Sequence, residues 1–311
     1  MEEGKIMSIW DTFSLQGSLF LMILAGLALK KLGILDDRGR KTLTDLCIDI
    51  VIPCNIIKSF LVPMDPSVLR SAAMLLAVGF LMQFFCLFLN RFLYNGYDDA
   101  QKKVLQYSTL VSNGGFLGNP VAEGIYGMEG LMYASVYLIP MRVVMWSAGT
   151  TYFVADAKSD KKQILKNVLT HPCLVGIYIG LFLMLTGLRL PGMVVSSIRS
   201  IGGCNSALTM FIIGMILDDV PARTLVNRTT AAYCVLRLGL LPFVTCLMCL
   251  PFGLTGAARG VAVLMTGMPA GATAAIFAAR YHSDAPFATR CVVLSTLVSM
   301  VTLPLWSVVL G

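Results

Sequence analysis

Three charged side chains lie inside long apolar stretches of this chain: Asp49, Glu123 and Arg142. Where such a stretch spans a membrane, a charge is costly and usually serves the transfer of an ion or a substrate. A carboxyl group there can gain and lose a proton, so Asp49 and Glu123 are candidates for ion coupling. Arg142 can hold a carboxylate through two parallel hydrogen bonds, or it can neutralise one of the two acidic groups. For the acidic residues, a salt bridge or a place at the membrane interface is the alternative.

Residues that unwind helices interrupt two of the apolar stretches, at 112–120 and at 266–273. Non-helical backbone at membrane depth is tolerated only beside protein or a water-filled cavity, because its N–H and C=O groups need partners. A matched pair of interruptions in the two halves of a chain indicates the binding site of a secondary transporter. Helix N-termini that begin there carry partial positive charge, which suits an anion. The predicted substrate-binding residues are Asn113, Gly114, Gly115, Asn119, Pro120, Pro269, Ala270 and Thr273.

Each of these candidates also has a structural interpretation. The interruptions can be kinks that only let helices pack closely. Asn55, which follows Pro53, is a further candidate for substrate contact, but a buried amide often forms a hydrogen bond between helices. Arg237 lies inside another apolar stretch and can pair with a carboxylate or with the carbonyl groups at a helix end. The sequence leaves these alternatives open.

The composition is that of a membrane protein with many spans in the lipid bilayer. Hydrophobic residues make up 57% of the chain and charged residues 13%, against about 25% charged in soluble domains. The net charge of +7 comes from short loops, where it sets orientation, so no nucleic-acid partner is expected. The nine cysteines are scattered through apolar runs and suggest packing. No metal site, nucleophile–base pair, P-loop or dinucleotide motif is recognisable, so we expect neither a cofactor nor an enzyme.

A spanning helix needs about 20 apolar residues, and ten stretches approach that length. Most lysines and arginines lie in the odd-numbered loops, which predicts that the N-terminus and the C-terminus are both outside. The first apolar stretch has no cleavage site before it, so it is expected to stay as a helix. The ten predicted spans are 12–30, 42–62, 69–90, 103–127, 129–155, 169–187, 191–217, 228–250, 256–279 and 286–310.

The most polar linker, 156–168, divides the spans into two sets of five. Because five is odd, a second copy of the same unit enters the membrane upside down. The fourth helix of each half is interrupted, and the second helix of each half carries a polar interruption. The sequence therefore predicts an all-α membrane protein with ten transmembrane helices in two inverted five-helix repeats, 1–155 and 169–311. The linker 156–168 is cytoplasmic in this arrangement, and the broken fourth and ninth helices cross.

Several motifs along nearly the whole chain resemble the auxin efflux carrier family. They are Ile52-Pro53, Asn113 to Pro120, Tyr126-Gly127, His171-Pro172, Arg237 with Pro242, Pro269 to Ala278, and Leu303-Pro304-Leu305. The resemblance implies two inverted repeats, a moving transport domain, a substrate site where the fourth and ninth helices cross, and transport of small organic anions. It also implies a plasma-membrane location and, by analogy, a homodimer. The short linker resembles compact, prokaryote-type members, whereas Glu123 and Arg142 depart from the pattern we expect.

The leading hypothesis is a secondary active transporter of a small organic anion, a carboxylate, that works by elevator-like alternating access. H⁺ or Na⁺ is the candidate coupling ion. A first alternative is a sodium- or proton-coupled carrier of another solute or of a cation, built on the same architecture. A second is a membrane sensor that binds a ligand without transporting it.

Overall fold

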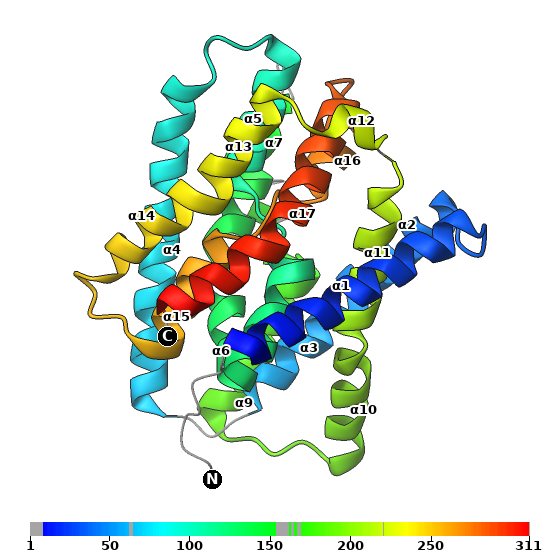
Figure 1. Cartoon of the computed structure of the whole chain (residues 1–311). Coiled ribbons are helices and arrows are strands. Elements are labelled where there is room, and N and C mark those ends of the chain that lie inside the picture. The colour runs from blue at the N-terminus through cyan, green and yellow to red at the C-terminus, as the bar shows by residue number, and fades with distance from the viewer. Residues whose placement is uncertain are drawn as a thin grey trace.

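The computed structural model describes residues 9–61, 65–153, 162, 165–166, 169–219 and 221–310. This part of the chain is helical and contains one isolated β-bridge (Figure 1). The elements of the first half are α1 (Ile9–Lys31), α2 (Asp37–Leu46), η1 (Cys47–Val51), α3 (Ile52–Phe60), α4 (Pro66–Leu93), α5 (Asp99–Leu110), η2 (Gly114–Gly118), α6 (Asn119–Val144), η3 (Met145–Gly149) and α7 (Thr150–Phe153). Elements marked η are short π-helical turns.

The second half repeats this mixture of long helices and π-helical turns. Its elements are α9 (Pro172–Thr186), α10 (Gly192–Gly203), α11 (Asn205–Leu217), α12 (Ala222–Leu225), α13 (Arg228–Val235), η4 (Leu236–Leu240), α14 (Leu241–Cys249), α15 (Gly256–Thr266), α16 (Thr273–Arg280) and α17 (Ala285–Leu310). The predicted linker 156–168 lies almost wholly outside the described residues.

Three of the π-helical turns have the same cause in the sequence. η1, η2 and η4 each end two residues before a proline, namely Pro53, Pro120 and Pro242. Proline has no N–H to donate and its ring crowds the carbonyl one turn earlier, so the helix widens there. The residue before each proline accordingly donates its N–H five residues back, as Asn119 does to the carbonyl of Gly114. Proline thus marks where helical geometry changes.

The fourth predicted span ends at a glycine that turns the chain. Gly127 has φ +64° and ψ −152°, a combination that favours glycine, and it divides α6 into two helical parts. The first part belongs to the predicted span 103–127 and the second to the span 129–155.

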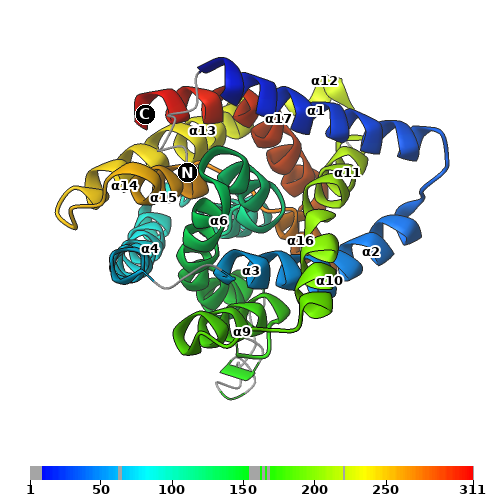
Figure 2. The same ribbon diagram turned by 90° about the horizontal axis from the view of Figure 1, so that it is seen from below.

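The helices pack with α6 at the centre (Figures 1 and 2). In both views α4 and α14 lie on one side of the molecule and α10 and α11 on the opposite side, where the end of α1 and α2 reach farthest out. Glycines allow the closest approaches, as is common where helices pack in a membrane. Gly26 of α1 lies against the backbone of Phe211 in α11, and Gly202 of α10 lies against the backbone of Asn55 in α3.

Among the described residues, four helical segments are long and apolar enough to cross a membrane: Pro66–Leu93, Gly192–Leu217, Arg228–Cys249 and Ala285–Leu310. A bent segment, Gly114–Val144 with Ser147–Phe153, makes a fifth if it is one span. Pro172–Thr186 and Gly256–Thr266 are apolar but shorter. The chain is therefore an all-helical protein with four or five recognisable spans, and the count of ten stays a prediction.

The α1–α11 contact gives a test of the packing. In Gly26→Ala the new Cβ would lie 2.3 Å from the carbonyl oxygen of Phe211, and backbone cannot move aside easily. We expect a loss of about 1–3 kcal/mol of stability, the usual cost of overpacking. Gly17→Ala in the same helix is the control, because its Cβ would meet nothing within 4 Å. Denaturant unfolding in mixed micelles measures both; equal stabilities for the two variants would contradict the packing.

Candidate functional site

The two predicted interruptions meet through their backbones. α5 ends at Leu110 and α15 ends at Thr266, and the segments that follow form an antiparallel β-bridge between Ser112 and Ala270. The N–H of Asn113 donates to the carbonyl of Pro269 at 2.8 Å, and the N–H of Gly271 donates to the carbonyl of Val111 at 3.1 Å. Each interruption therefore supplies partners for the backbone groups that the other leaves free.

Side chains from neighbouring helices bind the remaining carbonyl groups at the end of α5. Tyr233 donates its hydroxyl to the carbonyl of Ser108 at 2.9 Å, and Gln83 donates its amide to that of Leu110 at 3.3 Å. Arg237 donates to the carbonyl of Thr109 and, in the other interruption, to that of Met268, each at 2.9 Å. Two roles were predicted for Arg237, and the structure shows the second: Arg237 binds carbonyl groups where helices end.

A pocket of about 100 Å³ opens beside this junction. Residues 111–113, 115–116 and 271–273, where the half-helices η2 and α16 begin, form part of its wall. The first N–H groups of a helix have no partner within it, so both ends bring partial positive charge to the pocket. Its full lining is Ile48, Ile52, Val111, Ser112, Asn113, Gly115, Phe116, Met141, Arg142, Met145, His171, Cys173, Gly271, Ala272 and Thr273.

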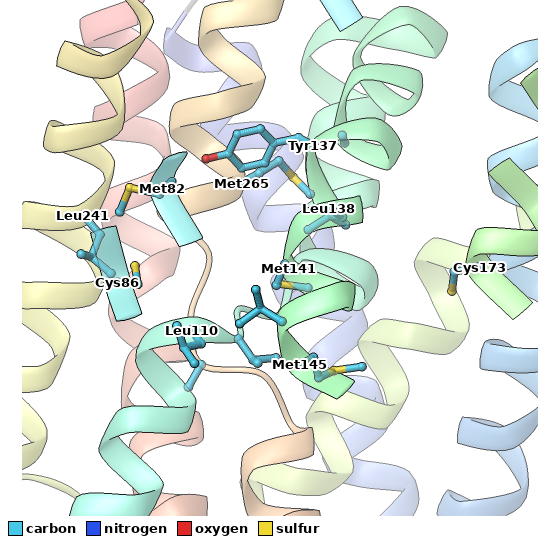
Figure 3. Close-up of a cluster of buried hydrophobic side chains, with 14 of the residues drawn as sticks. Met82, Cys86, Leu110, Tyr137, Leu138, Met141, Met145, Cys173, Leu241 and Met265 are labelled. Carbon is cyan, nitrogen blue, oxygen red and sulfur yellow. The ribbon is translucent and has the colours of Figure 1, made fainter. Parts of the chain in front are cut away.

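Apolar side chains surround the polar groups of the pocket. Figure 3 shows Met141 near the end of α6 and Met145 at the start of η3, and both line the pocket. Cys173 lies across from them on α9. Tyr107 donates its hydroxyl to the hydroxyl of Thr273 at 2.9 Å, which fixes the first residue of α16.

Two nitrogen donors at the pocket have no hydrogen-bond partner among the described residues: Nη1 of Arg142 and Nδ2 of Asn113. Arg142 is only 4% exposed and Asn113 only 5%. A buried donor without a partner costs free energy, and a buried charge costs more. Cys173 interacts with the guanidinium, but no carboxylate among the described residues forms an ion pair with Arg142. The arrangement therefore favours a ligand that accepts hydrogen bonds and carries negative charge.

The two glycines of the first interruption have different surroundings. A Cβ on Gly114 would lie 2.5 Å from a methyl group of Leu138, so this glycine allows close packing. A Cβ on Gly115 would meet nothing within 4 Å, and Gly115 lines the pocket. The absence of a side chain at Gly115 leaves space for a ligand near the backbone.

The two acidic candidates lie apart from the pocket lining. Glu123 accepts a hydrogen bond from the ammonium of Lys58 at 2.6 Å, in a pair that links α6 to α3. It therefore does not neutralise Arg142. Asp49 lies exposed in η1, and its charge reaches Cys173. Neither placement tests ion coupling, which stays a prediction.

The structure brings together four of the predicted substrate-binding residues in the pocket wall: Asn113, Gly115, Thr273 and Arg142. Pro269 and Ala270 belong to the backbone junction instead, and the N–H of Ala270 donates to the hydroxyl of Ser295 at 3.1 Å. The others, outside this lining, are Gly114, Asn55, Asn119 and Pro120.

Three further amides are buried without a hydrogen-bond partner among the described residues. Asn55, Asn119 and Asn205 are at most 1% exposed, and neither side-chain atom of any of them has a partner among the described residues. They come from α3, α6 and α11. Asn55 and Asn119 remain candidates for substrate contact, in a part of the molecule that the pocket does not reach.

The sequence alone did not single out Ser112, His171, Cys173 and Gly271 as part of the site. His171 was recognisable only as the residue before Pro172 at the start of the second half. The described residues contain no group of three or more His, Cys, Asp or Glu side chains that could hold a metal ion.

Residues 17–307 match the family described as "Membrane transport protein". The chain belongs to this family. The match confirms the resemblance to the auxin efflux carrier family that the sequence motifs indicate. One similar protein is an uncharacterised transporter of Methanothermobacter thermautotrophicus, 30% identical over 94% of this chain and 96% of the relative. An uncharacterised transporter of Methanocaldococcus jannaschii is 24% identical over 93% of this chain and 96% of its own length.

The Lys58–Glu123 pair gives a test of the contact between α3 and α6. Its side chains are 12% and 27% exposed, so water screens the charges less than at an open surface. In a double-mutant cycle with Lys58→Met and Glu123→Gln, we expect a coupling free energy of about 1 kcal/mol or more.

The Lys103–Asp99 pair of α5 is the matched control, since its carboxylate is 78% exposed. Asp99→Asn and Lys103→Met should couple by less than about 0.5 kcal/mol. Denaturant unfolding in mixed micelles gives both cycles. A coupling at the α3–α6 pair no larger than the control would show that this contact does not hold the two helices together.

Proposed function

We propose that this member of the membrane transport protein family is a secondary active transporter of a small organic anion, a carboxylate. The observation that carries the proposal is a pocket that Arg142 and Asn113 both line, in which Nη1 of Arg142 and the amide nitrogen of Asn113 have no partner among the described residues. A carboxylate has two oxygen atoms that accept hydrogen bonds and a charge that compensates the guanidinium. The N-termini of η2 and α16 add partial positive charge at the same place.

The charge balance around the junction supports an anion over a cation. Arg237 is 3% exposed and, like Arg142, forms no ion pair within the described residues. Two buried guanidinium groups near one pocket raise the cost of bringing in a cation. A cation carrier on the same architecture would require a carboxylate in the pocket wall, and the described lining has none.

Elevator-like alternating access is part of the proposal. α1, α3, α9, α10 and α11 contact one another, whereas α4, α5, α6 and α13 to α17 surround the junction. Two contacts are equivalent when the halves are exchanged: the first span, α1, packs on α11 of the seventh span, and the sixth span, α9, packs on α3 of the second. These contacts support two inverted repeats, 1–155 and 169–311. In the proposed motion, the helices around the junction slide past the group formed by α1, α3, α9, α10 and α11.

The remaining features follow from the same hypothesis. The broken fourth and ninth helices cross at the junction, both termini face outside, and the transporter lies in the plasma membrane with H⁺ or Na⁺ as the coupling ion. Asp49 and Glu123 are the acidic candidates for coupling. A homodimer is part of the proposal by analogy with the family. A ligand sensor without transport would bind the same anion but move none across the membrane.

Removal of the Arg142 charge tests the function. Purified Arg142→Gln protein should bind malonate about tenfold to a hundredfold more weakly than the wild type, because a charged hydrogen bond is lost. In proteoliposomes, uptake of malonate should fall in proportion. A panel of malonate, benzoate and indole-3-acetate, tested by thermal shift, identifies carboxylates that stabilise the protein.

Two arginine variants serve as controls. Arg70→Gln removes the same charge from the exposed start of α4 and should leave binding unchanged. Arg237→Gln should lower the melting temperature, because the carbonyl groups of Thr109 and Met268 lose their donor. Wild-type affinity in Arg142→Gln, or binding of a cation or neutral solute with no response to any organic anion, would contradict the proposal. Binding without uptake would favour the sensor.

A further inference from the structure

His171 is a titratable side chain in the wall of the Arg142 pocket. It is half-buried, directly precedes α9, and its Nδ1 accepts a hydrogen bond from the N–H of Cys173 at 3.2 Å. A nitrogen that accepts a hydrogen bond carries no proton, so the ring is neutral with its hydrogen on Nε2. The ring can therefore take up one proton, at Nδ1.

The charged and titratable groups around His171 come from its own helix and from the three elements packed on α9. α6 brings Arg142, whose positive charge acts on His171 directly. η1 brings Asp49, whose charge reaches Cys173. α3 brings Cys54 and Lys58, and the ammonium of Lys58 is bound to Glu123. Of the charged groups that these described elements bring, Arg142 is the one that acts on His171 directly.

The effect of the Arg142 charge on His171 depends on whether the pocket is empty or holds an anion. With the pocket empty, the guanidinium opposes a second positive charge on the imidazole. A carboxylate bound to Arg142 cancels that repulsion and adds a negative charge beside the ring. Protonation also turns both ring nitrogens into donors, which the oxygen atoms of the anion can accept. Anion binding and protonation therefore favour each other, and the coupling is reciprocal.

We propose that His171 takes up one proton when a carboxylate binds at Arg142, so that the anion and the proton cross the membrane together. The inference rests on the proposed function. The proton comes from the solvent on the side to which the pocket opens and forms an N–H bond at Nδ1. The hydrogen bond from the N–H of Cys173 breaks in this step. On the other side of the membrane the anion leaves, and the repulsion by Arg142 releases the proton.

Asparagine at position 171 separates protonation from the helix cap. Asn is among the residues that cap a helix N-terminus best, and its amide does not titrate. His171→Asn should therefore keep the start of α9 and a working Arg142 site while it removes the proton site. His171→Gln is the second variant, and size-exclusion chromatography confirms that each is folded.

The test counts the protons that accompany malonate binding. Calorimetry at one pH between 6 and 7.5, in two buffers with different ionisation enthalpies, gives this number for the wild type and for His171→Asn. Protonation of malonate itself is common to both proteins and cancels in the difference. We expect the wild type to take up about one proton more than the variant, so that its affinity rises about tenfold more for each pH unit of acidification.

Asp99→Asn, which removes an exposed carboxylate of α5, is the control and should keep the wild-type number of protons. Equal numbers in the wild type and His171→Asn would overturn the proposal. Loss of the extra proton in Asp49→Asn or Glu123→Gln, with His171 intact, would assign the proton to that carboxylate and overturn it as well. Malonate binding with no extra proton contradicts the role of His171 alone. If malonate, oxalate and acetate all fail to bind at any pH in this range, the carboxylate function itself is contradicted, and the role of His171 falls with it.

Discussion

The need of buried backbone groups for hydrogen-bond partners is the constraint on which the rest of this structure depends. α5 ends inside the molecule, where water does not reach its last carbonyl groups. Every carbonyl from Tyr107 to Val111 has a donor: the N–H of Val111, Tyr233, Arg237, Gln83 and the N–H of Gly271, in chain order. Apart from Val111, these donors come from three distant parts of the chain: α4, the segment of α13 and η4, and the second interruption. The interruption is therefore stable only within the complete fold.

The way in which these partners are supplied determines the chemistry beside the junction. The free carbonyl groups at the breaks are bound by Arg237 and by the backbone of the other interruption, whereas the N-termini of η2 and α16 face the pocket. The pocket therefore receives the positive ends of two helices but not the negative ends. Arg142 adds a full charge there, with one donor free. The proposed anion site thus follows from how the chain satisfies its own backbone at the two breaks.

Local sequence patterns predicted the breaks well because their causes are local. Glycine and proline at 114–120 and at 267–271 act on the backbone where they stand, and the π-helical turns before Pro53, Pro120 and Pro242 follow from a missing N–H. Arg142 was identified because a charge in an apolar stretch is conspicuous. The contacts of Glu123 were not predictable in this way, since Lys58 lies 65 residues earlier. His171 was missed for the same reason: its position in the pocket depends on how α9 packs against α3 and α6, which no local pattern encodes.

The central claim is that a carboxylate binds at Arg142, beside the backbone junction of the two interruptions. The most direct test is an experimental structure of the protein in lipid nanodiscs with malonate bound. The account predicts one carboxylate within hydrogen-bond distance of Nη1 of Arg142 and of the side-chain amide of Asn113. Malonate bound at a different place, with Nη1 of Arg142 still without a partner, would contradict it.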